Sequence, residues 1–347
     1  MMPDLTTEYM GLTLSNPVIA GPSPLTGSLA TLRALVANGA AAVVLPTLFQ
    51  EVIRRERDRH ECLCDEGAGC CHEVSGSYFP DAFADLAGVE PYLRLVANAR
   101  EVLSVPVIAS ICGATGHEWG SLARRLAEAG AHAIELNMAD PVLDMGRTGE
   151  DVETDMCHTV KAVKDAVGVP VAVKVGASFT SFVHAASRLA EAGADALVLF
   201  QRVHYPDVEL PLLRWRHELP LEGGTSRDAR QALTCLAALH GRVGAGLAAT
   251  GGVRSTDDVV KCILAGADAV MIASAPMLEG PPAIKARIDG LRAWLRDRGF
   301  ESVGQARGLL GIGRVGADES ARGDESARGL AGGHPAGARP IVSDTQL

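Results

Sequence analysis

The chain has 347 residues, of which 47% are hydrophobic, and its formal net charge is -10 at pH 7. This length allows one large α/β domain or two smaller ones, while the negative charge argues against nucleic acid or an anionic membrane as the main partner. No apolar run reaches the roughly 18 residues of a membrane span, and the N-terminus lacks a signal pattern. We therefore expect a cytoplasmic protein whose cysteines are mostly reduced.

Short apolar runs recur along the chain. Four of them repeat one phrase, in which a small-residue turn leads into a β run, as in AGAHAIEL at 129–136 and AGADAVMI at 265–272. Runs that are apolar at every position are typical of parallel strands covered on both faces. The sequence predicts eight such strands, at 16–21, 38–45, 105–110, 129–136, 169–175, 192–199, 246–252 and 265–272.

Helical patterns separate most of these strands. They carry apolar residues three and four positions apart and end at glycine, at 122–130, 158–168, 182–193 and 256–266. Eight βα units of this size predict a TIM (β/α)8 barrel. The alternative is an open doubly wound sheet, but no nucleotide-type glycine-rich turn follows the first strand.

Two regions lie outside the repeat. Residues 50–100 are too many for one crossover, so we expect an excursion over the barrel mouth within a barrel domain of residues 1–316. Residues 317–347 contain DESARGDESARG and then Gly/Pro/Ala-rich sequence. That composition predicts a disordered tail.

Small residues end the last two predicted strands, with Gly251 and Gly252 after the seventh and Ala273 and Ser274 after the eighth. Phosphate groups often bind TIM barrels at these two positions, where bare backbone lets N–H groups approach the phosphate oxygens. The alternative is that the glycines only make tight turns. We expect a phosphate-binding site.

Polar residues end two earlier strands. Lys174 closes the fifth strand and Asn137 closes the fourth. A lysine among valines and alanines has little structural reason to point inward, unless it neutralises an anion. The alternative is a surface lysine at a frayed strand end.

Four segments together resemble one family. They are TTEYMGLTLSNPVIAGPSPL (6–25), ELNMADP (135–141), VAVKVG (171–176) and the segment from Ala249 to Ala275. They are similar to the FMN-dependent dihydroorotate dehydrogenases, closest to the soluble class 1 branch, over residues 5–300. The resemblance implies a pyrimidine-biosynthesis oxidoreductase that oxidises dihydroorotate or a related dihydropyrimidine. A base removes the C5 proton, and hydride passes from C6 to flavin N5.

The resemblance also implies roles for individual residues. Lys174 would lie near N1 and O2 of the flavin, and Asn137 would orient the substrate. The expected FMN-binding residues are Ala20, Gly21, Asn137, Lys174, Gln201, Gly223, Gly224, Gly251, Gly252, Ala273 and Ser274.

The chain departs from the family pattern in the strand-four loop and at two other sites. Asp140 occupies the position of the catalytic base, or else it caps the loop before proline. Val142 replaces a family asparagine, Pro46 a lysine, and Asp81 a substrate-binding asparagine. The alternatives are therefore an FMN barrel with another substrate and a non-catalytic flavin-binding subunit.

The remaining motifs are less specific. No nicotinamide fingerprint is present, so the electron acceptor would be a small oxidant or a partner protein.

The other expectations are independent of the acceptor. We expect a homodimer. The segment 210–219 covers the site or meets a second subunit, and His204 faces either cofactor or solvent. We expect no metal, although a zinc or iron–sulfur site is the alternative for the cluster of Cys62, Cys64, Cys70, Cys71 and His72.

Overall fold

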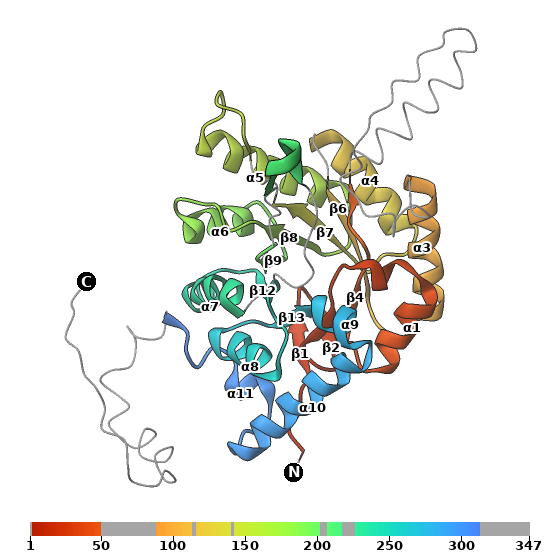
Figure 1. Cartoon of the computed structure of the whole chain (residues 1–347), viewed down its shortest axis with the longest axis vertical. Coiled ribbons are helices and arrows are strands. Elements are labelled where there is room, and N and C mark those ends of the chain that lie inside the picture. Colours follow the sequence, from red (N-terminus) through yellow and green to blue (C-terminus); the bar gives the residue numbers. More distant parts are fainter. Residues whose placement is uncertain are drawn as a thin grey trace, which may run out of the picture.

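A computed structural model describes residues 2–49, 88–112, 116–139, 142–201, 207–216 and 226–312 (Figure 1). Several predicted features lie outside these residues. They are most of the 50–100 excursion, the 317–347 tail, the cysteine cluster, Asp81, Asp140, His204, Gly223 and Gly224.

All eight predicted strands are confirmed, and they form a closed parallel barrel. The strands are β3 (Val18–Ala20), β4 (Val43–Val44), β6 (Val107–Cys112), β7 (Ala133–Met138), β8 (Val171–Val175), β9 (Ala196–Leu199), β12 (Gly246–Ala249) and β13 (Ala269–Ile272). Their order in the sheet is β4-β3-β13-β12-β9-β8-β7-β6, and β4 also pairs with β6, which closes the ring. A short extension, β5 (Leu48–Phe49), continues the second strand alongside β6.

Helices cover the outside of this ring (Figure 1). They are η1 (Pro24–Gly27), α1 (Leu29–Ala37), α3 (Val89–Val102), α4 (Gly116–Glu128), α5 (Gly149–Ala166), α6 (Phe182–Glu191), α7 (Ser226–Leu239), α8 (Thr256–Ala265), α9 (Ser274–Glu279), α10 (Pro282–Asp297) and α11 (Val303–Ala306). The four predicted helices are present. None of the described helices is both long and apolar enough to cross a membrane.

Two helices begin earlier than their patterns predicted, α4 by six residues and α5 by nine. We expected a helix from residue 158, but α5 begins at Gly149. Thr148 caps its N-terminus and forms a reciprocal capping box with Asp151. Such a cap starts a helix through polar residues that carry no apolar periodicity, which is why the pattern missed the first turns.

The end of the expected 50–100 excursion is an ordinary barrel helix. α3 contacts α1, α4 and β6, and it buries Tyr92, Leu95 and Val96 against the barrel. The described part of that segment therefore lies on the outside of the barrel.

A small hairpin closes the N-terminal end of the barrel, which we call the floor. It consists of β1 (Thr7–Tyr9) and β2 (Leu12–Leu14), joined through Met10 and Gly11, both with positive φ. Tyr9, Met10 and Leu14 are at most 5% exposed and pack against inward-facing residues of the strands, including Ile19, Ile108, Ala133, Ala172, Ala248 and Met271. A second hairpin, β10 (Asp207–Glu209) and β11 (Arg214–Arg216), encloses η3 (Leu210–Leu212).

Candidate active site

The described residues that were predicted to bind cofactor or substrate gather at one end of the barrel. They follow or close the strands β7, β8, β9, β12, β13 and β3, which are consecutive neighbours in the sheet. Because the strands are parallel, their carboxyl ends meet at the same rim, where the active sites of TIM barrels lie. In sheet order these residues are Asn137, Lys174, Gln201, Gly251, Gly252, Ala273, Ser274, Ala20 and Gly21.

Backbone contacts fix this order along the rim. Asn137 and Lys174 are register partners on β7 and β8. The Gln201 N–H donates to the Val175 carbonyl at 2.8 Å, and the Gly21 N–H donates to the Ile272 carbonyl at 2.9 Å. The rim residues thus form a continuous arc rather than scattered positions.

The two small-residue strand ends lie next to each other. β12 and β13 pair at Ala249 and Val270, so the loops that follow them leave the barrel side by side. Gly251 has φ +77°, and a Cβ atom there would lie 2.8 Å from the Phe200 carbonyl oxygen. Only glycine fits this position, so the loop presents bare backbone.

The end of β3 approaches the same place. A Cβ atom on Gly21 would lie 3.5 Å from the Ile272 oxygen and 3.6 Å from the Ala273 Cβ. Three chain segments without large side chains therefore meet at one part of the rim, which suits a bulky group bound by backbone N–H groups.

Beneath the rim, charged side chains lie inside the barrel, in what we call the polar layer. Lys174 is 4% exposed and Glu135 is 0% exposed, and the Lys174 Nζ lies 3.9 Å from the Glu135 Oε1. The lysine at the strand end thus points inward, as the interpretation of an anion-neutralising residue requires.

One neighbouring strand, the connection between β4 and β5, and one helix support Glu135. Its Oε1 accepts a hydrogen bond from the Ser110 Oγ at 2.9 Å, and the Ser110 Oγ is 3.0 Å from the Thr47 Oγ1. The Tyr92 hydroxyl accepts from the Ser110 N–H at 3.0 Å and donates to the Ser110 carbonyl at 3.1 Å. The position of Glu135 is therefore set by β6 and α3 as well as by its own strand.

Burial shifts the titration of this layer. It lowers the pKa of Lys174, and the nearby Glu135 partly opposes that shift. Burial raises the pKa of Tyr9 well above 10, helped by the charges of Glu135 and Asp268. Tyr9 thus stays protonated beneath a buried ion pair.

Sequence reasoning missed Glu135, Ser110, Thr47 and Tyr92. A signal existed for Glu135, because a carboxylate in the middle of the apolar run AHAIELNM lies two residues before Asn137, and residues two apart in a strand share a face. Ser110 and Tyr92 gave no such signal.

Two of the departures from the family pattern are visible in the structure. Pro46 is buried just after β4, so no cation stands at that position. Val142 is 50% exposed, and its neighbours Leu143 and Met145 are more exposed still.

Three cysteines lie on the outer helices of the barrel, Cys157 on α5, Cys235 on α7 and Cys262 on α8. Burial raises the pKa of Cys262 to about 12 and also raises the pKa of Cys157 and Cys235. Thiols of that kind are poor nucleophiles. Within the described residues, no group of His, Cys, Asp and Glu side chains could hold a metal ion.

Comparison with known proteins decides the family. The sequence profile described as dihydroorotate dehydrogenase matches residues 84–295. This chain belongs to the dihydroorotate dehydrogenase family. The earlier resemblance is thereby confirmed.

Curated relatives of the dihydroorotate dehydrogenase family cover nearly the whole barrel. The chain is 30% identical over 311 residues to the dihydroorotate dehydrogenase B (NAD(+)) catalytic subunit of Methanothermobacter thermautotrophicus, covering 88% of this chain and 98% of the relative. It is 34% identical over 218 residues to the putative dihydroorotate dehydrogenase A (fumarate) of Aeropyrum pernix, covering 60% and 69%. A catalytic subunit from Endomicrobium trichonymphae is 26% identical over 321 residues, covering 91% and 99%.

Dihydroorotate dehydrogenases are FMN-dependent oxidoreductases that act on a CH–CH bond. The residues of this chain fit such a cofactor. The rim offers bare backbone at Gly251, and the polar layer offers a buried cation at Lys174. Within the described part of the chain, the buried Glu135 Oε2 has no hydrogen-bond partner, which is costly unless a bound group or water supplies one.

Proposed function

We propose that this protein is an FMN-dependent oxidoreductase that oxidises dihydroorotate or a related dihydropyrimidine. One observation carries the proposal: the bare backbone after β12 and β13 and the buried Lys174 of β8 lie along one continuous arc of the rim. That arc offers a phosphate site at one end and a fixed positive charge at the other. Membership of the dihydroorotate dehydrogenase family supports the same reading.

The phosphate of the cofactor would be held by the two loops. Gly251 and Gly252 provide N–H groups, both with positive φ, and Ser274 adds a hydroxyl beside Ala273. When bound, FMN supplies the two-electron acceptor that the oxidation requires.

Lys174 would place a positive charge near N1 and O2 of the flavin. Its ammonium group is almost excluded from solvent and lies beside Glu135, so it cannot turn away to water. An oriented charge in a low-dielectric site stabilises developing negative charge more than the same charge in water. Lys174 therefore favours the reduced, anionic form of a bound redox group.

Asn137 and Asp140 would act on the substrate. Asn137 is 4% exposed and shares the register of Lys174, so it can orient a ring lying over the mouth. Asp140 follows three residues later and is the proposed base that accepts the C5 proton. The substrate loses that proton and a hydride from C6, and a C5=C6 double bond forms.

The names of the relatives support a proposal about the electron acceptor. Two are named as catalytic subunits of an NAD(+)-linked enzyme and one as a fumarate-linked enzyme. We infer that this chain passes electrons to a partner subunit or a small oxidant, and that it works in the cytoplasm as a homodimer.

A second candidate function differs only in substrate. Pro46 is buried where the family has a lysine, which favours a dihydropyrimidine without the carboxylate of dihydroorotate. A missing cation weakens binding of an anion without weakening binding of a neutral analogue.

An anaerobic titration tests both candidates. The purified full chain should be yellow, and dihydroorotate should bleach its flavin absorbance. Bleaching by dihydrouracil but not by dihydroorotate would select the second candidate. A colourless protein that does not acquire bound flavin from added FMN would refute the proposal.

A further inference from the structure

Arg287, a largely covered arginine on α10, joins the two proposed phosphate loops. We propose that Arg287 and Glu279 are positioning residues that hold these loops at a fixed separation and thereby give the site its preference for FMN over unphosphorylated riboflavin. This inference rests on the proposed function. We call Arg287, Glu279 and the Arg254 carbonyl the brace.

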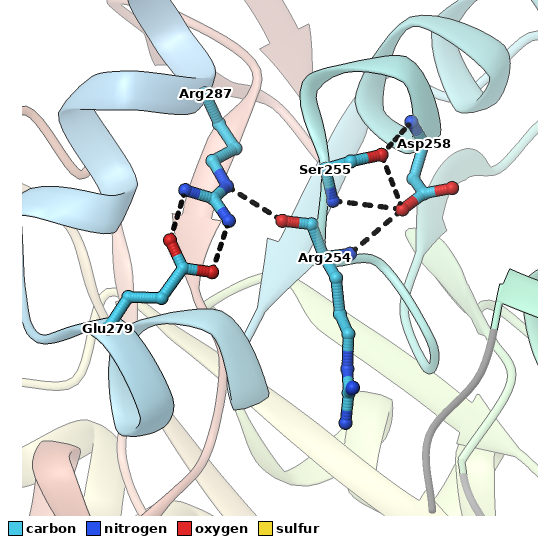
Figure 2. A network of polar contacts seen from close by, with 5 residues as sticks. All are labelled: Arg254, Ser255, Asp258, Glu279 and Arg287. Atoms are coloured by element: carbon cyan, nitrogen blue, oxygen red, sulfur yellow. Dashed lines mark hydrogen bonds and ion pairs between the residues drawn. The ribbon is translucent and has the colours of Figure 1, made fainter. Parts of the chain in front are cut away.

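The brace uses every nitrogen of one guanidinium (Figure 2). Arg287 of α10 donates from Nε to the Arg254 carbonyl at 2.7 Å. It also donates to both carboxylate oxygens of Glu279, from Nη1 at 2.7 Å and from Nη2 at 2.5 Å. Bidentate contacts of this kind fix geometry as well as contribute energy.

The two ends of the brace belong to the two loops. Arg254 follows Gly252 by two residues in the loop after β12, and Glu279 is the last residue of α9, the helix that begins at Ser274 after β13. A single side chain therefore connects the segment carrying Gly251 with the segment carrying Ser274.

The Arg254 peptide is also held from its other side. The Asp258 Oδ2 accepts hydrogen bonds from the Arg254 N–H at 3.1 Å, the Ser255 N–H at 2.9 Å and the Ser255 Oγ at 2.8 Å (Figure 2). Burial acts to raise the pKa of Asp258, but these hydrogen bonds outweigh it, so the pKa is lowered. The loop after the glycines is thus fixed between an ionised carboxylate and the brace.

Close packing sets the position of α10, which carries Arg287. A Cβ atom on Gly290 would lie 2.3 Å from the Thr256 Oγ1, at the start of α8. The helix can approach this closely only because residue 290 is glycine. α10 therefore packs closely against the chain next to Arg254, whose carbonyl Arg287 bonds.

Another ion pair on the same helix is a natural control. Lys285 and Asp289 are 64% and 49% exposed, whereas Arg287 is 12% exposed and its partner Glu279 is 49% exposed. Exposed i,i+4 pairs contribute little, and this one touches neither loop. Removal of Lys285 also removes one positive charge from α10, as removal of Arg287 does.

The brace should affect the phosphate and not the ring. Lys174 and Asn137 lie on β8 and β7, separated from the β12 and β13 loops by β9. A small shift between the two loops therefore weakens contacts with the phosphate while the ring keeps its neighbours. General loss of structure would instead weaken FMN and riboflavin alike.

The experiment measures dissociation constants of FMN and riboflavin for the full chain after its flavin is removed, by flavin fluorescence quenching. The variants are Arg287→Ala, the charge-conserving Arg287→Lys, Glu279→Gln and the control Lys285→Ala, each checked by circular dichroism and thermal unfolding. Arg287→Lys keeps the charge but loses the fork, and it keeps the test decisive should Arg287→Ala not fold.

We expect Arg287→Ala and Arg287→Lys to reduce the preference for FMN by about tenfold or more, the effect of losing one hydrogen bond between a displaced loop and the charged phosphate. Glu279→Gln should act in the same direction, and Lys285→Ala should leave the preference unchanged. Riboflavin affinity should be the same in all variants.

The outcomes separate this inference from the proposed function. An unchanged preference in a folded Arg287 variant, with wild type still favouring FMN, overturns the brace alone. Equal loss of FMN and riboflavin affinity also overturns it, because the role is then merely structural. A wild-type protein that binds FMN no more tightly than riboflavin overturns the proposed phosphate site and the brace with it.

Discussion

The two ends of the barrel interior are built from different chemistry. At the floor, Tyr9 and Leu14 of the β1–β2 hairpin pack with alanines and methionine from the strands. Ala133 of β7 and Ala172 of β8 face the floor. Two residues further along the same faces, Glu135 and Lys174 form the polar layer. Buried charges cost stability, so apolar packing accounts for the floor but not for the polar layer.

Removing one partner of the buried Glu135–Lys174 ion pair should cause the largest loss of stability. Glu135→Ala leaves Lys174 buried beside no counter-charge, and such losses cost about 3–5 kcal/mol. Urea unfolding would measure the decrease in the free energy of unfolding. Glu153→Ala, which breaks the more exposed pair with Arg188, is the control and should cost far less.

The pH dependence of Glu135→Ala gives a second measurement. Burial already lowers the pKa of Lys174, and the variant lowers it further. Between the lowered pKa of Lys174 in the folded variant and pH 10.5, the ordinary lysine pKa, the folded variant binds fewer protons than the unfolded chain. Its stability therefore rises with pH over that range. The deficit relative to wild type should shrink as pH approaches 10; a constant deficit would contradict the assignment.

A floor substitution should change stability without changing binding. Leu14→Ala removes a side chain that is 1% exposed, at a cost of about 3 kcal/mol. Its dissociation constant for FMN should match that of wild type under conditions where both are folded. A loss of FMN affinity of tenfold or more would show that the floor is not merely packing.

The smallest effect is expected within the polar layer itself. Ser110→Ala removes a hydroxyl that donates to Glu135 and contacts Thr47, at a cost of about 1–2 kcal/mol in unfolding free energy. Thr47→Val keeps the donor to Glu135 and is the matched control. Equal costs in the two variants would indicate that Ser110 does not support the carboxylate.

Some of this architecture could be predicted from sequence, because the information was local. Four of the eight strands repeat one short phrase, and Gly251 and Ser274 lie at the ends of the seventh and eighth predicted strands. Lys174 was recognised because a cation among valines is conspicuous.

The support of the site could not be predicted, because it depends on contacts distant in sequence. In strands buried on both faces there is no polar alternation to show which side chains face inward, so Ser110 and its partner Tyr92 carried no signal. Arg287 pairs with Glu279 across the turn at Gly280 and Pro281. It also donates to the Arg254 carbonyl, which lies 33 residues earlier in the chain. The β1–β2 hairpin was missed because its strands have three residues each.

The floor, which Tyr9, Met10 and Leu14 close, limits how a molecule can reach the site. Because the hairpin closes this end of the barrel, a molecule that binds next to Lys174 can approach and leave only from the rim. Substrate and any small oxidant would then reach and leave the candidate site across the same rim.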